Sequence, residues 1–273
     1  MPNGSTNDVL AEQPRRFPWR VLWFLLAASL AGAAAAIPLF LDVFLPVIQS
    51  GPPLPMSLPL LVAISAAQNL LLFAVAIGFG LWLARKMGLL GAPLLESWLY
   101  GGGSPVRLRD SLKYGVLVGI AVGLILLVII IPAAPYLPGL PFVSAARVAL
   151  WKRVLICFYG GIDEEVLTRL FLLTLLAWLG TRMFQRSKAP LVPVTFWVAN
   201  IIVAILFGLG HLPSASMVMH ITPTVVVLAL VLNGIAAIPF GYLYWKRGLE
   251  AAMIAHFCAD FVIYVVGPAF LKT

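Results

Sequence analysis

Charged residues are scarce in this chain of 273 residues: they make up 10% of it, while hydrophobic residues make up 62%. A soluble domain usually contains about 25% charged residues, so the shortage of charge excludes a soluble globular protein. The mean hydropathy of +1.03 points the same way. Because the chain is long enough for several apolar spans of roughly 20 residues, we expect one polytopic membrane domain.

Other features are missing as well. Cysteine occurs only twice, as Cys157 and Cys258, and both lie in apolar segments, so no disulfide framework is indicated. The apolar runs lack the alternation of a membrane barrel, and backbone exposed to lipid must form its hydrogen bonds within the segment. The spans should therefore be helices, and the fold all-α. An internal repeat, common in transporters, is not visible either.

Seven apolar runs predict seven transmembrane helices, with an eighth, short element before Asp163 as an open alternative. Residues 1–17 are predicted to form a polar tail, and residues 18–273 a single transmembrane domain. The stretch 87–100 is too short to span and is expected to lie at the membrane interface. The predicted spans cover roughly 18–47, 58–84, 114–134, 147–181, 191–213, 222–245 and 249–267.

The net charge of +8 has two explanations, nucleic-acid binding or basic loops on one side of a membrane. With the N-terminus inside, 13 of the 18 basic residues fall in the inner segments, as the positive-inside rule requires. We therefore expect no nucleic-acid partner. The expected location is a multi-pass protein of the bacterial inner membrane or an equivalent membrane, with a cytoplasmic N-terminus.

Charged groups within the predicted spans indicate function, because each costs about 2.5–3.5 kcal/mol at the bilayer centre. The fourth span contains 163-DEEVLTR-169. Glu165 and Arg169 are four residues apart on a helix and are predicted to pair. Glu164 is rotated by about 100° from Glu165, so it remains an unpaired carboxylate, available as a base that takes a proton from water.

Two later spans contain the histidines of interest. His211 lies near the end of the fifth run, just after Gly208 and Gly210, which would allow neighbouring helices to approach. His256 and Asp260 are four apart in the seventh, so the carboxylate is expected to hold one imidazole nitrogen and present the other. Such a set can activate water and stabilise an oxyanion, with or without a metal. A nucleophile elbow and a His-Glu-x-x-His zinc motif are both missing.

Three motifs in order resemble the CPBP intramembrane proteases, which include the type II CAAX prenyl endopeptidases. They are Glu-Glu-x-x-x-Arg at 164–169, Phe-x-x-x-His at 207–211 and His-x-x-x-Asp at 256–260. The resemblance covers about 150–265, with the protease-like core at about 147–267. It implies that Glu164 activates water, while His211 and His256 position it or stabilise the oxyanion. Asp260 stands where the eukaryotic enzymes have Asn, and as a carboxylate it suits a metal or a protonated histidine.

The resemblance leaves the cofactor open, because relatives are described both as metalloproteases and as metal-independent glutamate proteases. The candidate ligands for a divalent metal such as zinc are Glu164, His211, His256 and Asp260. The expected partners are the lipid bilayer and a membrane-embedded or lipid-modified peptide or protein substrate. The alternatives are a non-catalytic scaffold or binding protein with the same fold, or an ion- or proton-coupled transporter.

One expectation conflicts with a single site. The fifth and seventh spans run in the same direction, yet His211 comes late in its span and His256 early, so simple helices would place them at different depths. Either the fifth helix starts later and continues past Pro213, or it breaks there and the chain re-enters the membrane.

Overall fold

The computed structural model describes residues 17–51, 56–136, 147–184 and 191–270, and within these ranges helices and the loops between them make up the whole fold, without strands. Seven of its helical segments are long and apolar enough to cross a membrane, which confirms the predicted fold class and number of spans. The helices of the first half are α1 (Trp19–Ser50), α2 (Leu58–Met87), α3 (Pro93–Tyr100) and α4 (Leu108–Ala133), with the 3₁₀ turn η1 (Ala134–Tyr136).

The second half begins with one long span that no described loop interrupts. This span consists of α6 (Leu150–Phe158), the π-helices η2 (Tyr159–Glu164) and η3 (Val166–Leu173), and α7 (Thr174–Phe184). The predicted polar tail, residues 1–17, lies outside the described residues except for Phe17. The described part of the chain has no eighth span, and helix runs unbroken from Leu150 into the segment that contains Asp163.

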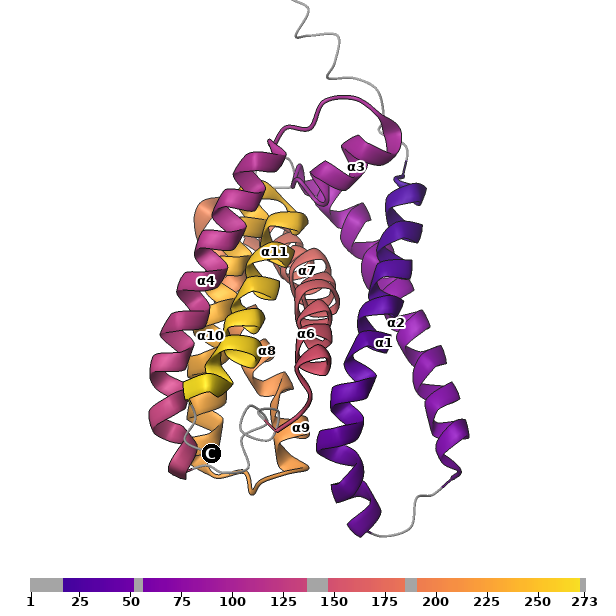
Figure 1. The fold of residues 1–273 in the computed structure, drawn as a ribbon. Helices are drawn as coiled ribbons and strands as arrows, with labels where there is room; N and C mark the ends of the chain where they lie inside the picture. Colours follow the sequence, from indigo (N-terminus) through magenta and orange to yellow (C-terminus); the bar gives the residue numbers. More distant parts are fainter. Residues whose placement is uncertain (1–16, 52–55, 137–146, 185–190, 271–273) are drawn as a thin grey trace, which may run out of the picture.

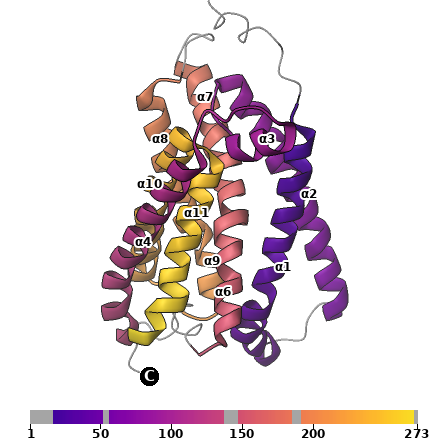
Figure 2. The same cartoon turned by 45° about the horizontal axis from the view of Figure 1, so that its top comes forward.

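The remaining helices are α8 (Pro193–Gly210), α9 (Leu212–Ser216), α10 (Pro223–Arg247) and α11 (Leu249–Asp260). The last continues as the π-helix η4 (Phe261–Val266) and the 3₁₀ turn η5 (Gly267–Phe270). Helices α1 and α2 form a pair beside the rest of the bundle, with α6 and α7 between that pair and α11 (Figures 1 and 2). Short α3 lies across one end of the bundle, opposite to the end where the chain terminates (Figure 1).

Helix α11 is held at close range to α4 by small residues. A Cβ added at Gly115, Gly119 or Gly123 of α4 would lie 3.0 Å or less from α11 or from η4, which follows it. Within a membrane, where burial of apolar surface does not drive helix association, such small residues permit the backbone approach that stabilises packing. The glycines, spaced four apart, meet carbonyls of alanines with the same spacing, namely Ala251, Ala255 and Ala259.

The π-helical segments alter the backbone where the charge cluster lies. A π-helix bonds residue i to i+5 and is rare outside functional sites. Thr174 follows this pattern with its side chain, since its hydroxyl donates to the carbonyl of Arg169 five residues earlier at 3.1 Å. The charged residues of the fourth span thus sit on a widened helix, not on the regular α-helix that the spacing argument assumes.

Candidate functional site

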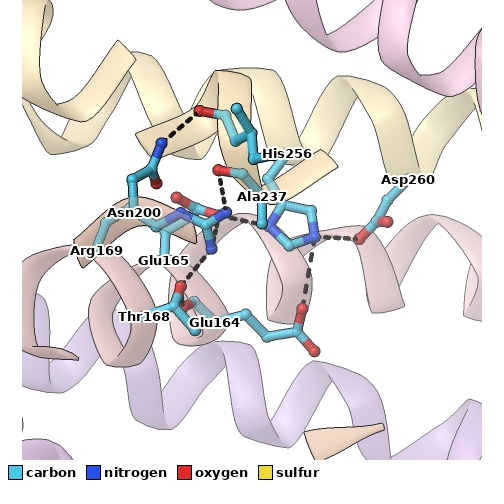
Figure 3. A network of polar contacts seen from close by, with 9 residues as sticks. Glu164, Glu165, Thr168, Arg169, Asn200, Ala237, His256 and Asp260 are labelled. Atoms are coloured by element: carbon cyan, nitrogen blue, oxygen red, sulfur yellow. Dashed lines mark hydrogen bonds and ion pairs between the residues drawn. The ribbon is translucent and has the colours of Figure 1, made fainter. Parts of the chain in front are cut away.

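His256 lies at the centre of a buried polar network (Figure 3). Its Nδ1 is 2.7 Å from Oε1 of Glu165, while its Nε2 faces Oε2 of Glu164 at 3.5 Å and Oδ2 of Asp260 at 3.8 Å. Because Glu165 also pairs with Arg169, it is a carboxylate acceptor, and Nδ1 of His256 donates the hydrogen. The hydrogen bond at Nδ1 fixes the orientation of the imidazole, and Nε2 points toward the carboxylates of Glu164 and Asp260.

The predicted pair of Glu165 and Arg169 forms, with 3.1 Å between Oε1 and Nη1, and both side chains are fully buried. The guanidinium also donates to the Thr168 hydroxyl and, at 3.1 Å, to the carbonyl of Ala237 on α10. A buried charge pair offsets the cost of its desolvation only when further hydrogen bonds satisfy it. These bonds satisfy Nη1 and Nη2 of Arg169, while its Nε and Oε2 of Glu165 are buried without a hydrogen-bond partner among the described residues, and they connect the fourth span to α10.

Aromatic rings complete the surroundings of Arg169. Its guanidinium carbon lies 5.4 Å from the centre of the Phe207 ring and 5.7 Å from that of Phe240. Cations within about 6 Å of an aromatic face are attracted to it, most strongly in a desolvated site. Phe240 also lies against the imidazole of His256, with 5.1 Å between ring centres. The two rings separate the ion pair from lipid and limit the movement of His256.

Glu164 differs from its neighbour in access. Its side chain is 20% exposed, whereas that of Glu165 is 0% exposed. The Glu164 carbonyl accepts a hydrogen bond from Thr168, which fixes its backbone, and its carboxylate reaches toward Nε2 of His256. The prediction that the two carboxylates point in different directions agrees with this geometry. Glu165 is buried in contact with Arg169 and His256, and Glu164 is partly exposed.

Asp260 does not orient His256 in the way that the four-residue spacing suggests. Glu165 binds the imidazole at Nδ1, and Asp260 stands 3.8 Å from Nε2, too far for a hydrogen bond. The expected orienting role therefore belongs to Glu165, which arrives from another helix. Asp260 instead packs over Gly160, where an added Cβ would collide with its carboxylate and lie 3.1 Å from Nε2 of His256. The absence of a side chain at Gly160 makes room for the site.

His211 and His256 lie on the same aromatic ring, which resolves the expected conflict in depth. Phe207 makes a T-shaped contact with both imidazoles, with its ring centre 4.7 Å from that of His211 and 6.1 Å from that of His256. Helix α8 ends at Gly210, and the chain continues into α9 after a turn at His211. Nδ1 of His211 donates to the Phe207 carbonyl at 2.8 Å, which leaves Nε2 for another contact.

The structure does not connect every candidate. Within the described part of the chain, His211 forms no hydrogen bond or ion pair with Glu164 or His256. The two glycines that precede it also differ: a Cβ at Gly208 would lie 3.0 Å from Cα of Leu230 on α10, while Gly210 has open space around it. Only Gly208 fulfils the expected role of allowing helices to approach.

Asp163, the first residue of the acidic run, lies outside this network. Its carboxylate is buried against Gly32 of α1, where an added Cβ would collide with Oδ2. Asp163 therefore faces α1, while Glu164 and Glu165 face α10 and α11. Of the three consecutive acidic residues, one therefore packs against α1 and the other two contact His256.

We tested whether the candidate ligands fit a metal ion. Among the residues that the structure describes, no group of three or more His, Cys, Asp or Glu side chains has a suitable arrangement. Glu165 pairs with Arg169 and also binds Nδ1 of His256. The groups left for a metal are Nε2 of His256 and the carboxylates of Glu164 and Asp260, which form only a partial donor set.

Sequence reasoning missed several residues that build the site. Thr168, Gly160 and the Ala237 carbonyl each contact the network directly. Asn200 was missed too: it is buried on α8 and donates to the carbonyl of Ile238 at 3.0 Å (Figure 3). An asparagine within an apolar span is a visible signal, since buried polar groups in membranes require partners. The carbonyls carry no signal in the sequence.

A comparison with known protein families matches the segment of the chain that contains this site. Residues 146–262 match the family model described as Type II CAAX prenyl endopeptidase Rce1-like. Over these residues the chain is similar to the Rce1-like family. The Rce1-like segment contains Glu164, Glu165, Arg169, His211 and His256, as well as Asp260, so the predicted resemblance is confirmed where its motifs lie.

The match to the Rce1-like family model supports a CAAX-type intramembrane protease at the level of the family. Together with the seven apolar helices, it identifies a multi-pass integral membrane protein. Searches of the curated proteins and of the solved structures gave no match.

Proposed function

We propose that this protein is an intramembrane endopeptidase in which Glu164 activates a water molecule to cleave a peptide bond. The observation that carries the proposal is the contrast between adjacent carboxylates: Glu164 is partly exposed and faces Nε2 of His256, while Glu165 is buried and its Oε1 contacts both Arg169 and His256. A general base must reach both water and substrate, and of the two adjacent glutamates only Glu164 has a partly exposed side chain.

The proposed reaction begins with a water held by Glu164 and by Nε2 of His256, both acting as acceptors. Glu164 takes one proton while the water oxygen attacks the carbonyl carbon of the scissile bond. The proton then passes from Glu164 to the amide nitrogen, and the carbon–nitrogen bond breaks to give an acid and an amine. His256 is held ready by its Nδ1–H bond to Glu165, so little reorganisation accompanies the reaction.

His211 has a supporting place in this scheme. Phe207 holds its ring by an edge contact, and the Phe207 carbonyl accepts from Nδ1 at 2.8 Å. The free Nε2 is then available to the substrate, where a protonated imidazole would stabilise the oxyanion as it forms. Asp260 adds negative charge beside Nε2 of His256 and is proposed to tune that group, not to hold it.

The proposed substrate is a membrane-embedded or lipid-modified peptide, in keeping with the description of the matched family as a prenyl endopeptidase. We also propose a cytoplasmic N-terminus, because basic residues gather at one end of the bundle. The ends of α2, α7 and α10 that contain Arg85, Arg182 and Lys246 all lie toward α3 (Figure 1). The positive-inside rule assigns such an end to the cytoplasm.

The test uses purified protein in nanodiscs and an internally quenched peptide that ends in a farnesylated CAAX sequence. Wild type should cleave it, and Glu164→Gln should lower kcat by 100-fold or more. The matched control is Asp163→Asn, an adjacent acidic residue that faces α1 and should keep wild-type turnover. Equal cleavage by wild type and Glu164→Gln would exclude Glu164 as the base, and a wild type that cleaves no prenylated peptide would favour the non-catalytic alternative.

A further inference from the structure

The polar side chain of Asn200 lies deep in an otherwise apolar helix. Asn200 is 1% exposed, and its Nδ2 donates to the carbonyl of Ile238 on α10 at 3.0 Å. On the other side, its amide rests directly on Gly241, where an added Cβ would collide with Oδ1. A polar group in a membrane interior is costly to bury, and here α10 provides both the acceptor for its Nδ2 and the space for the amide.

The carbonyl that Asn200 binds is next to the one that Arg169 binds. Arg169 donates to Ala237 and Asn200 to Ile238, so two consecutive carbonyls of α10 are held from two different helices (Figure 3). Both directly precede Pro239, which lies inside α10. Proline has no N–H to donate, and its ring displaces the carbonyl four residues earlier, which is that of Ile235. The backbone of α10 is therefore weakened in the turn that contains Ala237 and Ile238.

These contacts form one chain from α8 to the imidazole. Asn200 fixes Ile238, and the adjoining Ala237 carbonyl binds Arg169, which pairs with Glu165 at 3.1 Å. Glu165 in turn holds Nδ1 of His256 at 2.7 Å. A shift of the two carbonyls would therefore move the guanidinium, and through it the imidazole that faces Glu164.

We propose that Asn200 is a positioning residue for the proposed peptidase reaction: with Gly241, it holds the backbone of α10 before Pro239 so that the Arg169–Glu165 pair keeps His256 in place. This role rests on the proposed function, because it concerns the same site. It assigns no direct contact with substrate to Asn200.

The experiment exploits the collision between Asn200 and a side chain at position 241. Asn200→Ala removes the amide, and Gly241→Ala pushes it off the Ile238 carbonyl, so each should lower kcat by about 10-fold or more and leave KM within about twofold. In the double variant the new methyl group occupies the vacated space. Its kcat should therefore lie within about twofold of that of Asn200→Ala, far from the product of the two single effects.

Gly234→Ala is the matched control, since it makes the same change on α10 at a place with open space around it, and it should keep wild-type kcat. A second readout does not depend on cleavage. The chain has three histidines, so ¹⁵N-labelled imidazoles give a spectrum that can be assigned by substitution. The Nδ1–H signal of His256 should shift in both single variants and stay unchanged in Gly234→Ala.

Multiplicative losses in the double variant, or an unchanged His256 signal in Asn200→Ala, would overturn the positioning role. A wild type without cleavage would refute the proposed function while the imidazole signal still tested Asn200. If a single variant fails to fold, the other single variant and the imidazole spectrum decide.

Discussion

His256 receives its orientation from Glu165, which lies 91 positions earlier in the chain, and not from Asp260 on its own helix. Nδ1 of His256 is 2.7 Å from Oε1 of Glu165, whereas Oδ2 of Asp260 is 3.8 Å from Nε2. The Rce1-like motif residues are therefore connected across helices, with Glu165 serving as the link between a cation and an imidazole. Glu164 remains the carboxylate with access to the reaction.

The hydrogen bond between Glu165 and His256 predicts how the imidazole responds to substitution. Charge-assisted bonds are shorter and stronger than neutral ones, so Glu165→Gln should move the Nδ1 proton of His256 to lower frequency in NMR spectra of ¹⁵N-histidine protein. Asp260→Asn should leave this proton signal in place and keep kcat within about tenfold of wild type. A shift caused by Asp260→Asn but not by Glu165→Gln would contradict the assignment.

Gly160 predicts a steric requirement at the site. In Gly160→Ala the new methyl group would collide with Asp260 and stand 3.1 Å from Nε2 of His256, and displacements near 1 Å can cost about 100-fold in rate. We expect a loss of that size in kcat/KM. Gly210→Ala, beside His211 but with open space around it, is the control and should cleave normally. Equal rates for both variants would show that the Gly160 contact is unimportant.

The glycines of α4 predict where a larger side chain would disrupt the packing of α4 against α11. Gly119→Val would force a branched side chain onto the carbonyl of Ala255 and Cβ of Cys258. Overpacking of this kind costs about 1–3 kcal/mol of unfolding free energy, measured by denaturant titration in detergent. Leu124→Ala, on the exposed face of the same helix, should change that free energy by less than about 1 kcal/mol. A larger loss in the control would mean that α4 packs by its other face.

The buried ion pair predicts a pattern among single and double variants. Glu165→Met leaves the guanidinium of Arg169 buried without its partner and should lower the unfolding free energy by about 3–5 kcal/mol. Replacing both residues with Met should recover much of this loss while activity remains absent. The exposed pair of Arg107 and Asp110 is the control, since Asp110→Asn should cost about 1 kcal/mol or less. A double variant less stable than either single one would contradict the account.

Some of this site follows from the sequence because the relevant contacts are local. Seven apolar runs suffice for seven spans, and the Glu165–Arg169 pair follows from residues four apart. The same spacing rule failed for His256 and Asp260, because it describes which residues share a helix face and not what packs against that face. The bond from Glu165 to His256 depends on how α11 is seated against α4 and the fourth span, which glycine contacts decide.

Other features were beyond local reasoning for physical reasons. The π-helical backbone around Glu164 and the turn at His211 set the directions of side chains, and neither follows from residue type alone. The carbonyls of Ala237 and Ile238 contribute through the backbone, which looks alike at every position. Asn200 was visible as a polar residue in an apolar run, but its partner lies 38 positions away.

The central claim is that the adjacent glutamates have different roles: Glu164 is the general base, and Glu165 holds Arg169 and His256 in position. The most direct measurement is kcat for Glu164→Gln together with its unfolding free energy, compared with the same two quantities for Glu165→Gln. We predict that Glu164→Gln loses 100-fold or more in kcat with its stability within about 1 kcal/mol of wild type, whereas Glu165→Gln loses about 3 kcal/mol or more of stability. Wild-type turnover by a folded Glu164→Gln variant would contradict the account.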